Sequence, residues 1–190
     1  MHILRRLLPT FGVILITFGF AFLVPQIVAI IGADGGEHDF WLPFLVSVML
    51  GAFLVFPAII SGKMPELQPK DGILLVVLCW SFLPALACLP FVIHFSTTDA
   101  PISWFFAYFE AVSGLTTTGA TVLTGLDNLP YSINLWRCWL QWIGGMGILI
   151  LAVAILPLVS TGAGSIFKAE STGPLKEAKL TPRIDRKSVV

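Results

Sequence analysis

A short polar run, rich in threonine and glycine, interrupts the apolar sequence. It reads Thr-Thr-Thr-Gly-Ala-Thr over residues 116–121. A row of backbone carbonyls can replace the water around a dehydrated cation, and a glycine in the row can take a positive φ that lets consecutive carbonyls face one way. The run therefore predicts a cation selectivity filter; the alternative is an ordinary turn outside the membrane. The expected oxygen ligands come from Thr116, Thr117, Thr118 and Gly119.

Two charged residues flank this run within apolar sequence. Glu110 precedes it, and Arg137 follows it as the only basic residue between Lys70 and Lys168. Charges inside a membrane are expensive and usually pair with one another. We hypothesise that Arg137 pairs with Glu110 and anchors a pore helix. The alternative is that Arg137 extends to the membrane surface while Glu110 meets water or backbone donors.

The composition is that of a membrane protein. Hydrophobic residues make up 56% of the 190 and charged residues only 12%, whereas soluble domains average about 25% charged residues. Uncharged stretches cover residues 7–33, 40–62, 72–94 and 138–167. Each is longer than the roughly 20 residues that a helix needs to cross a bilayer. We predict an all-α membrane protein, and its first span is too long to be a cleaved signal peptide.

One further apolar segment, residues 101–114, is too short to cross. Stretches of about 10–14 apolar residues are more often re-entrant or interfacial than spanning. We expect a helix that enters the membrane over this segment, the threonine-rich run returning behind it, and a turn at residues 126–130. The resulting unit is helix, pore helix, filter and helix, preceded by two further transmembrane helices.

The basic residues predict the orientation in the membrane. Ten of the eleven Lys and Arg residues precede the first span, follow the second or follow the fourth. The loop 34–39 and the region 95–131 contain none. Because cytoplasmic loops are enriched in basic residues, both termini are expected in the cytoplasm, and the turn at 126–130 is expected at the outer face.

Other motifs provide no second chemistry. Cys79, Cys88 and Cys138 lie in apolar stretches and have neither metal-site nor disulfide spacing. No Ser/His/Asp, Cys/His or carboxylate constellation indicates an enzyme. The glycines at 144, 145 and 147 sit in an apolar stretch, which favours close helix contact over a nucleotide-binding loop. We expect no enzymatic activity, no cofactor and no nucleic-acid partner.

Aromatic residues and one histidine mark the expected membrane boundary. Trp and Tyr are enriched at membrane interfaces, and four tryptophans are predicted to form such a belt and to pack the pore helix. These are Trp104, Trp136, Trp139 and Trp142. His94, near the end of the third span, is expected at the interface because no second metal ligand stands nearby in the sequence.

Several motifs, taken in order, resemble the membrane subunits of bacterial Trk potassium-uptake systems, in the Trk/Ktr/HKT superfamily. The resemblance runs essentially from the first residue to the C-terminal tail. Its motifs are the run 110–123, Asp-Asn-Leu-Pro at 127–130, Trp-Arg at 136–137, Gln-Trp-Ile-Gly-Gly-Met-Gly-Ile at 141–148 and Leu-Thr-Pro-Arg-Ile at 180–184.

The resemblance implies a function, a division of the chain and partners. Residues 1–70 would form the two N-terminal transmembrane helices, 71–167 the first helix–pore–helix repeat, and 168–190 a cytoplasmic linker to a second repeat. Potassium would be the substrate, coordinated at Thr117 and Thr118, with Gly119 as the filter glycine. Family members act in the bacterial inner membrane with a cytosolic nucleotide-binding regulatory subunit, and they form homodimers when full length.

The sequence departs from this family in length. Family members carry four helix–pore–helix repeats in one chain, whereas one is present here, which would supply one quarter of a filter. We expect an N-terminal fragment. The alternatives are a homotetrameric cation channel with one repeat per chain, and a non-conducting membrane assembly or regulatory protein. The sequence does not decide between channel-like transport and symport with protons or sodium.

Overall fold

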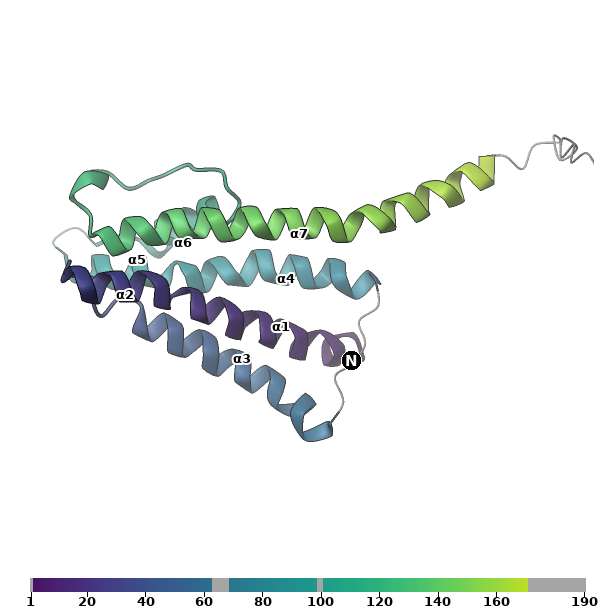
Figure 1. The fold of residues 1–190 in the computed structure, drawn as a ribbon, viewed down its shortest axis with the longest axis horizontal. Helices are drawn as coiled ribbons and strands as arrows, with labels where there is room; N and C mark the ends of the chain where they lie inside the picture. Colours follow the sequence, from purple (N-terminus) through teal and green to yellow (C-terminus); the bar gives the residue numbers. More distant parts are fainter. Residues whose placement is uncertain (1, 63–68, 99–100, 171–190) are drawn as a thin grey trace, which may run out of the picture. The chain divides into compact units, whose positions relative to one another are not determined.

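The part of the chain that the structure describes has only helices as regular elements. The structure, a computed structural model, describes residues 2–62, 69–98 and 101–170. The chain forms two compact units, Met1–Leu149 and Ile150–Val190. The first holds the helices from α1 to the first half of α7, and the second holds the continuation of α7 (Figure 1). The predicted all-α fold class is confirmed.

The N-terminal part is a helical hairpin. α1 (His2–Ala21) leads into α2 (Leu23–Gly32), and α3 (Trp41–Ser61) returns beside α1 (Figure 1). The break between α1 and α2 lies just before Pro25. Proline has no N–H to bond the carbonyl one turn back and its ring clashes there, which accounts for the interruption.

Small residues hold α1 and α3 together. A Cβ added to Gly12 would lie 2.7 Å from the carbonyl oxygen of Gly51, and one added to Gly51 would lie 2.6 Å from that of Gly12. In the same contact, the Ser47 hydroxyl donates to the Leu15 carbonyl at 2.7 Å. Small residues let helix backbones approach closely inside membranes, so α1 and α3 form a tight pair.

The next pair of helices is interrupted in a similar way. α4 (Pro69–Ala87) and α5 (Leu89–Ser96) are separated at Cys88, just before Pro90. The carbonyl of Ala87, at the break, accepts a hydrogen bond from the Trp136 indole nitrogen at 2.9 Å. A buried carbonyl at a helix break needs such a partner, and a side chain of α7 provides it.

The remaining elements frame the predicted filter. α6 (Trp104–Leu115) is followed by an irregular segment, the 3-10 helix η1 (Leu126–Asn128) and α7 (Tyr131–Glu170). The predicted short helix over 101–114 is thus present as α6, shifted slightly toward the C-terminus. After α6 the irregular segment returns alongside α7 to η1 (Figure 1).

One end of the first unit gathers most of its loops, and we call it the loop end. It contains residues 33–40, 97–98 and 123–130, together with the start of α7. α6 starts near this end and stops beside Gly144, about 20 Å along α7 from its first residue at 1.5 Å per residue. α6 and the segment after it therefore enter and leave the bundle at the same end.

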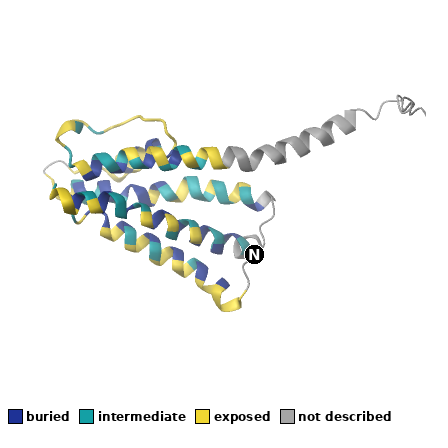
Figure 2. Ribbon diagram, viewed as in Figure 1, coloured by how far each residue is buried: buried dark blue, intermediate teal, exposed yellow. Residues whose placement is uncertain are grey.

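The core near the loop end is aromatic. Trp136 is fully buried, with its ring centroid 4.6 Å from that of Phe22 and 6.0 Å from that of Phe40. Buried residues concentrate on the facing sides of the helices (Figure 2). The predicted place of Trp136 in an interfacial belt is therefore wrong: its polar nitrogen finds a partner inside the protein, so it has no need of the interface.

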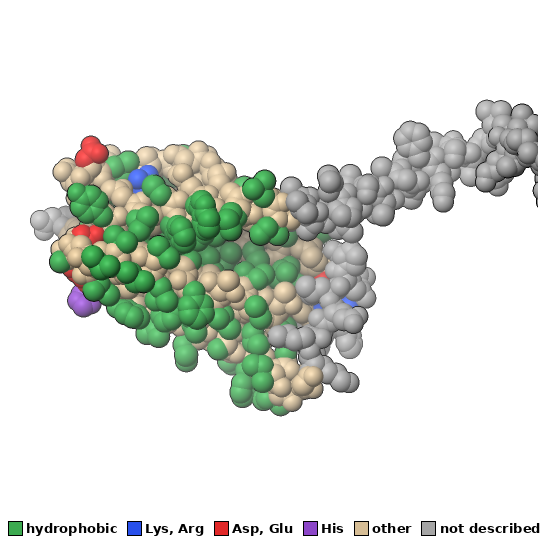
Figure 3. Space-filling model, in the orientation of Figure 1, with side chains coloured by type: hydrophobic (Ala, Val, Ile, Leu, Met, Phe, Trp, Pro, Cys, Tyr) green, Lys and Arg blue, Asp and Glu red, His purple; other side chains and the backbone are tan. Residues whose placement is uncertain are grey.

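The outer faces of the helices are strongly apolar. Three helical stretches are long and apolar enough to cross a membrane, Arg6–Gly32, Trp41–Ser61 and Asp71–Ser96, among the residues that the structure describes. Large apolar side chains point away from the core along α3, namely Met49, Phe53, Ile59 and Ile60. Figure 3 shows hydrophobic side chains spread over the visible face. The first three predicted spans coincide with these stretches, and the fourth falls within α7.

Candidate functional site: the segment after the short helix

The end of α6 lies directly against the backbone of α7. A Cβ added to Gly144 would overlap the carbonyl group of Leu115, the last residue of α6. Only glycine admits an approach this close. Gly144 thus makes the close helix contact that the sequence predicted for the glycine cluster. The contact positions Leu115, and with it the start of the polar run at Thr116.

Residues 116–119, the predicted filter segment, have an alternating backbone. Thr116 has φ −84°, Thr117 φ 58° and Gly119 φ 73°, while Thr118 is not among the residues of positive φ. Alternation between the two halves of φ space lets successive peptide groups face the same side. The positive φ was expected at Gly119 but not at Thr117, where a β-branched side chain makes it a genuine outlier.

Ser113 organises this backbone from inside α6. Its carbonyl accepts hydrogen bonds from the amides of Thr118 at 3.0 Å and Gly119 at 3.4 Å. Its hydroxyl donates to the Ala120 carbonyl at 2.6 Å. The serine is 5% exposed. Sequence reasoning missed this role; the only signal was a serine in the last turn of a short helix, within reach of a polar run.

The carbonyl oxygens of the predicted filter segment are free acceptors. Among the described residues, no hydrogen bond ends on the carbonyls of residues 116–119, and all four residues are exposed in the single chain. The Thr116 hydroxyl donates to the Val112 carbonyl at 2.8 Å and lies 2.8 Å from the Thr118 hydroxyl. The segment thus presents unpaired carbonyls, while hydroxyls support the backbone.

Glu110 and Arg137 are in contact beneath the returning segment, residues 120–125. Arg137 Nε donates to Glu110 Oε1 at 2.7 Å. The two side chains that the sequence predicts to pair are thus brought together, and Glu110 is 4% exposed. Burial of a carboxylate is tolerated when it is paired and hydrogen-bonded, and both conditions hold here.

The Glu110 carboxylate also binds the returning segment. The Thr121 hydroxyl lies 3.0 Å from each carboxylate oxygen, and the Val122 amide donates to Oε2 at 3.2 Å. On the other side, Arg137 contacts Asn134 Oδ1 at 3.5 Å, and Asn134 donates to the Leu126 carbonyl at 2.8 Å. The sequence predicted the ion pair and, as the alternative, backbone donors to Glu110; the structure shows both, and adds the side chains of Thr121 and Asn134.

The electrostatic setting favours a cation. α6 ends at Leu115 and its carbonyl end meets the predicted filter segment. The C-terminus of a helix carries about half a negative charge, and the free carbonyls add partial negative charge at the same place. The ion pair beside them is internally neutral. The arrangement can donate oxygen ligands to a cation, although one such segment is only part of a coordination shell.

His94, which the sequence places at the membrane interface, is buried within the protein and paired with a carboxylate. It is 8% exposed, and its Nδ1 lies 2.8 Å from Oδ2 of Asp39, which is 5% exposed. The pair links the end of α5 to the loop between α2 and α3. A sequence separation of 55 residues left no local signal for it.

The fold and the site together define a helical membrane protein of the transport class. Apolar helices flank a short helix that stops inside the bundle, and an oxygen-rich segment of irregular backbone follows it. Residues 42–190 match the TrkH family, described as cation transport proteins. The chain belongs to this family, which is one of transport proteins rather than enzymes.

Individual relatives agree with this assignment. The chain is 42% identical over 188 residues to the Trk system potassium uptake protein TrkH of Escherichia coli K12, covering 97% of this chain and 37% of that protein. It is 32% identical over 173 residues to TrkG of the same organism, covering 91% of this chain and 35% of that protein. The resemblance seen in the sequence motifs is confirmed.

A solved structure extends the similarity to the fold. The crystal structure of the potassium transporter TrkH from Vibrio parahaemolyticus has a TM-score of 0.71 and 38% sequence identity, covering 87% of this chain and 36% of that chain. The chain therefore spans little more than a third of the length of the relatives it matches.

Proposed function

We propose that this chain contributes one of four filter segments to a pore for potassium uptake. The observation that carries the proposal is the row of free carbonyls at residues 116–119, held on an alternating backbone beside the end of α6. Thr117 and Thr118 would coordinate potassium, with Thr116 and Gly119 completing the row. Names of the relatives, which describe potassium uptake, support the choice of ion.

The same proposal assigns the parts of the chain. Residues 1–70 are two transmembrane helices, 71–167 one helix–pore–helix repeat and 168–190 a cytoplasmic linker; of the last, 171–190 lie outside the described residues. α6 and its filter segment are re-entrant from the outer face of the bacterial inner membrane, where the loop end lies. Both termini are cytoplasmic. Glu110 and Arg137 give structural support to the filter.

Partners follow from the family resemblance. Three further filter segments are required, because four carbonyl strands enclose an ion where one cannot. They come from the rest of a longer chain, or from three further copies. A cytosolic nucleotide-binding regulatory subunit and, for the full-length protein, a second copy in a homodimer complete the proposed assembly. No cofactor takes part, and potassium is the substrate.

The test uses two glycines with the same backbone conformation. Gly119 has φ 73° in the filter segment, and Gly125 has φ 67° just before η1, outside it. A Cβ added to Gly119 has open space, and one added to Gly125 lies no closer than 3.8 Å to another atom. Gly119→Ala and Gly125→Ala should therefore introduce similar backbone strain, but only the first introduces it inside the predicted filter segment. We expect only Gly119→Ala to lower the ratio of potassium to sodium flux.

The measurement is ion flux into liposomes containing the 190-residue chain. Selective flux lost in Gly119→Ala means that copies of this chain form the pore. If the folded protein gives no flux, this chain is put in place of the corresponding part of the Vibrio parahaemolyticus transporter. Both glycine variants are then measured in that chimeric protein. The proposed function is wrong if the two glycine variants change selectivity alike, or not at all, in an assembly that conducts.

A further inference from the structure

The loop between α2 and α3 is bound firmly to the rest of the bundle at the loop end. Gln26 Nε2 donates to the Glu37 carbonyl at 2.7 Å, and the buried Asp39–His94 pair ties the loop to α5. The Gly36 amide donates to Asp34 Oδ1 at 3.0 Å, which fixes the Asp34 side chain within the loop. Two bonds to neighbouring helices and one bond inside the loop thus hold residues 33–40 in place.

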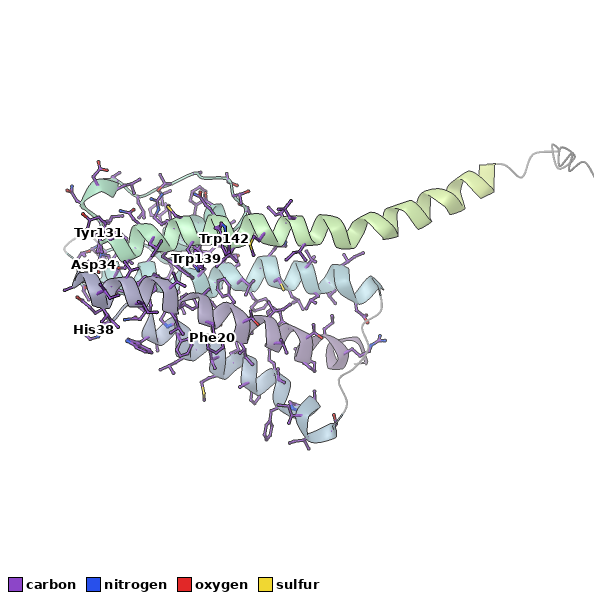
Figure 4. The ribbon with its side chains drawn as sticks, viewed as in Figure 1. Phe20, Asp34, His38, Tyr131, Trp139 and Trp142 are labelled. Carbon is purple, nitrogen blue, oxygen red and sulfur yellow. The ribbon has the colours of Figure 1, made fainter. Side chains whose placement is uncertain are left out.

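Asp34 reaches from this loop to the start of α7. The Ser132 amide donates to Asp34 Oδ2 at 2.7 Å, and the Ser132 hydroxyl donates to Oδ1 at 3.1 Å. Figure 4 shows Asp34 beside Tyr131, the first residue of α7. A Cβ on Gly36 would overlap the Ser132 hydroxyl, so the loop backbone lies directly against this turn.

Asp34 caps the N-terminus of α7 from a distant part of the chain. The first N–H groups of a helix have no partner within it, and they are usually bound by the side chain of the residue preceding the helix. Here that residue is Pro130, whose carbonyl accepts from the Asn134 amide at 3.1 Å but whose side chain has no acceptor. A carboxylate 98 residues earlier in the sequence takes its place, with the negative charge that a helix N-terminus favours.

The capped first turn of α7 is followed directly by the residues that contact the returning segment. Arg137 lies about 7.5 Å along the helix from Ser132 at 1.5 Å per residue. From there the contacts run through Glu110 to the Thr121 hydroxyl and the Val122 amide. Asn134, on the same turns, holds the Leu126 carbonyl. A displacement of the first turns of α7 therefore moves Asn134 directly, and through Arg137 it acts on the Glu110 carboxylate of α6 that holds residues 121 and 122.

We propose that Asp34 is a positioning residue for the filter: by capping α7 from the N-terminal hairpin, it sets the place of Arg137 and hence of the segment that leaves the filter. The inference deepens the proposed function and rests on it only in treating residues 116–119 as the filter. It also assigns a role to the N-terminal hairpin, because the loop between α2 and α3 contains Asp34.

The test is hydrogen exchange of backbone amides, measured by mass spectrometry on the 190-residue chain in lipid nanodiscs. Asp34→Ala is expected to speed exchange at the Val122 amide about fivefold, the factor that the loss of a typical helix cap represents. Asp34→Asn is expected to restore the slow exchange only in part, because its single amide oxygen can accept from the Ser132 amide or from the Gly36 amide but not from both. Amides of α1 and α3 serve as the internal reference and keep their rates.

The control removes a different acid from the same loop. The Glu37 carboxylate contacts the Gly35 amide at 3.4 Å, within the loop, and Glu37→Ala is expected to leave exchange at Val122 unchanged. If Asp34→Ala does not fold, Ser132→Ala removes one of the two bonds to Asp34 and gives a smaller change in the same direction.

Three results would overturn the inference: no change at Val122, an equal rise throughout the chain, or an equal rise with Glu37→Ala. None of them depends on ion flux. A failed Gly119 experiment with a positive result here would remove the proposed function and leave the link between Asp34 and the returning segment standing.

Discussion

The α1–α3 pair and the α6–α7 region solve the same problem of a dry environment in different ways. In the hairpin, regular helices satisfy their own backbones, and Gly12 and Gly51 let them touch. Around the filter segment the backbone is irregular, so its polar groups need outside partners, which Ser113 and Glu110 supply. Non-helical backbone at membrane depth survives only where protein or water satisfies it.

The difference teaches where polar residues belong in such a chain. The hairpin tolerates an almost wholly apolar sequence because helix geometry makes its hydrogen bonds. The filter region concentrates a serine, a glutamate and an arginine within a few turns, each bound to a named backbone or side-chain atom. Loss of one partner should therefore be felt more strongly in the second region than in the first.

The largest effect is expected from Glu110→Ala. The change leaves Arg137, whose side chain is 17% exposed, without its carboxylate. Removal of one partner from a buried ion pair costs about 3–5 kcal/mol, and the Val122 amide loses its acceptor as well. The free energy of unfolding in lipid bicelles measures this. Glu110→Ala combined with Arg137→Ala should cost less than the sum of the two single changes; simple additivity would contradict the pairing.

A smaller effect is expected in the hairpin from Gly12→Ala. Its new Cβ meets the Gly51 carbonyl oxygen at 2.7 Å and the side chains of Leu54 and Val55 within 2.9 Å. Overpacking of this kind costs about 1–3 kcal/mol. Gly72→Ala in α4 is the control, because nothing lies within 4 Å of its added Cβ and alanine is the better helix former by up to about 1 kcal/mol. Equal unfolding free energies for the two variants would show that the hairpin contact is loose.

The smallest effects on stability come from a matched pair of serines, one in each region. Ser47→Ala removes a bond to the Leu15 carbonyl, and Ser113→Ala removes one to the Ala120 carbonyl. Interhelical and buried hydrogen bonds of this kind contribute about 0.6–1 kcal/mol, so both unfolding free energies should fall by a similar amount. Only Ser113→Ala should change the ratio of potassium to sodium flux. The same selectivity in both serine variants would mean that Ser113 does not shape the filter.

Hydrophobic runs and one charge pair carried most of what the sequence predicted. Span length, the short helix and the Glu110–Arg137 contact follow from the bilayer dimension and from the cost of buried charge. Span length and the short helix can be recognised from one stretch of sequence, and the ion pair can be recognised because charged residues are rare in the apolar segments. Because Arg137 is the single Lys or Arg between Lys70 and Lys168, it is the natural partner for Glu110.

What the sequence did not reveal depends on contacts between distant segments. Trp136 is surrounded by Phe18 of α1, Phe22 at the break between α1 and α2, and Phe40 just before α3. Nothing in the residues next to it in the sequence distinguishes it from an interfacial tryptophan. The positive φ of Thr117 runs against its own steric preference. The tertiary structure imposes it, as it does the Asp39–His94 pair and the capping of α7 by Asp34.

The Glu110–Arg137 contact also has a consequence for biosynthesis. The two residues are 27 positions apart, and a ribosome adds about 5–20 residues per second. For roughly one to five seconds at that rate the emerging chain holds a carboxylate in an apolar helix with no guanidinium yet made. α6 can settle in its final place only once the first turns of α7 have left the ribosome, so the filter segment is among the last parts of this unit to form.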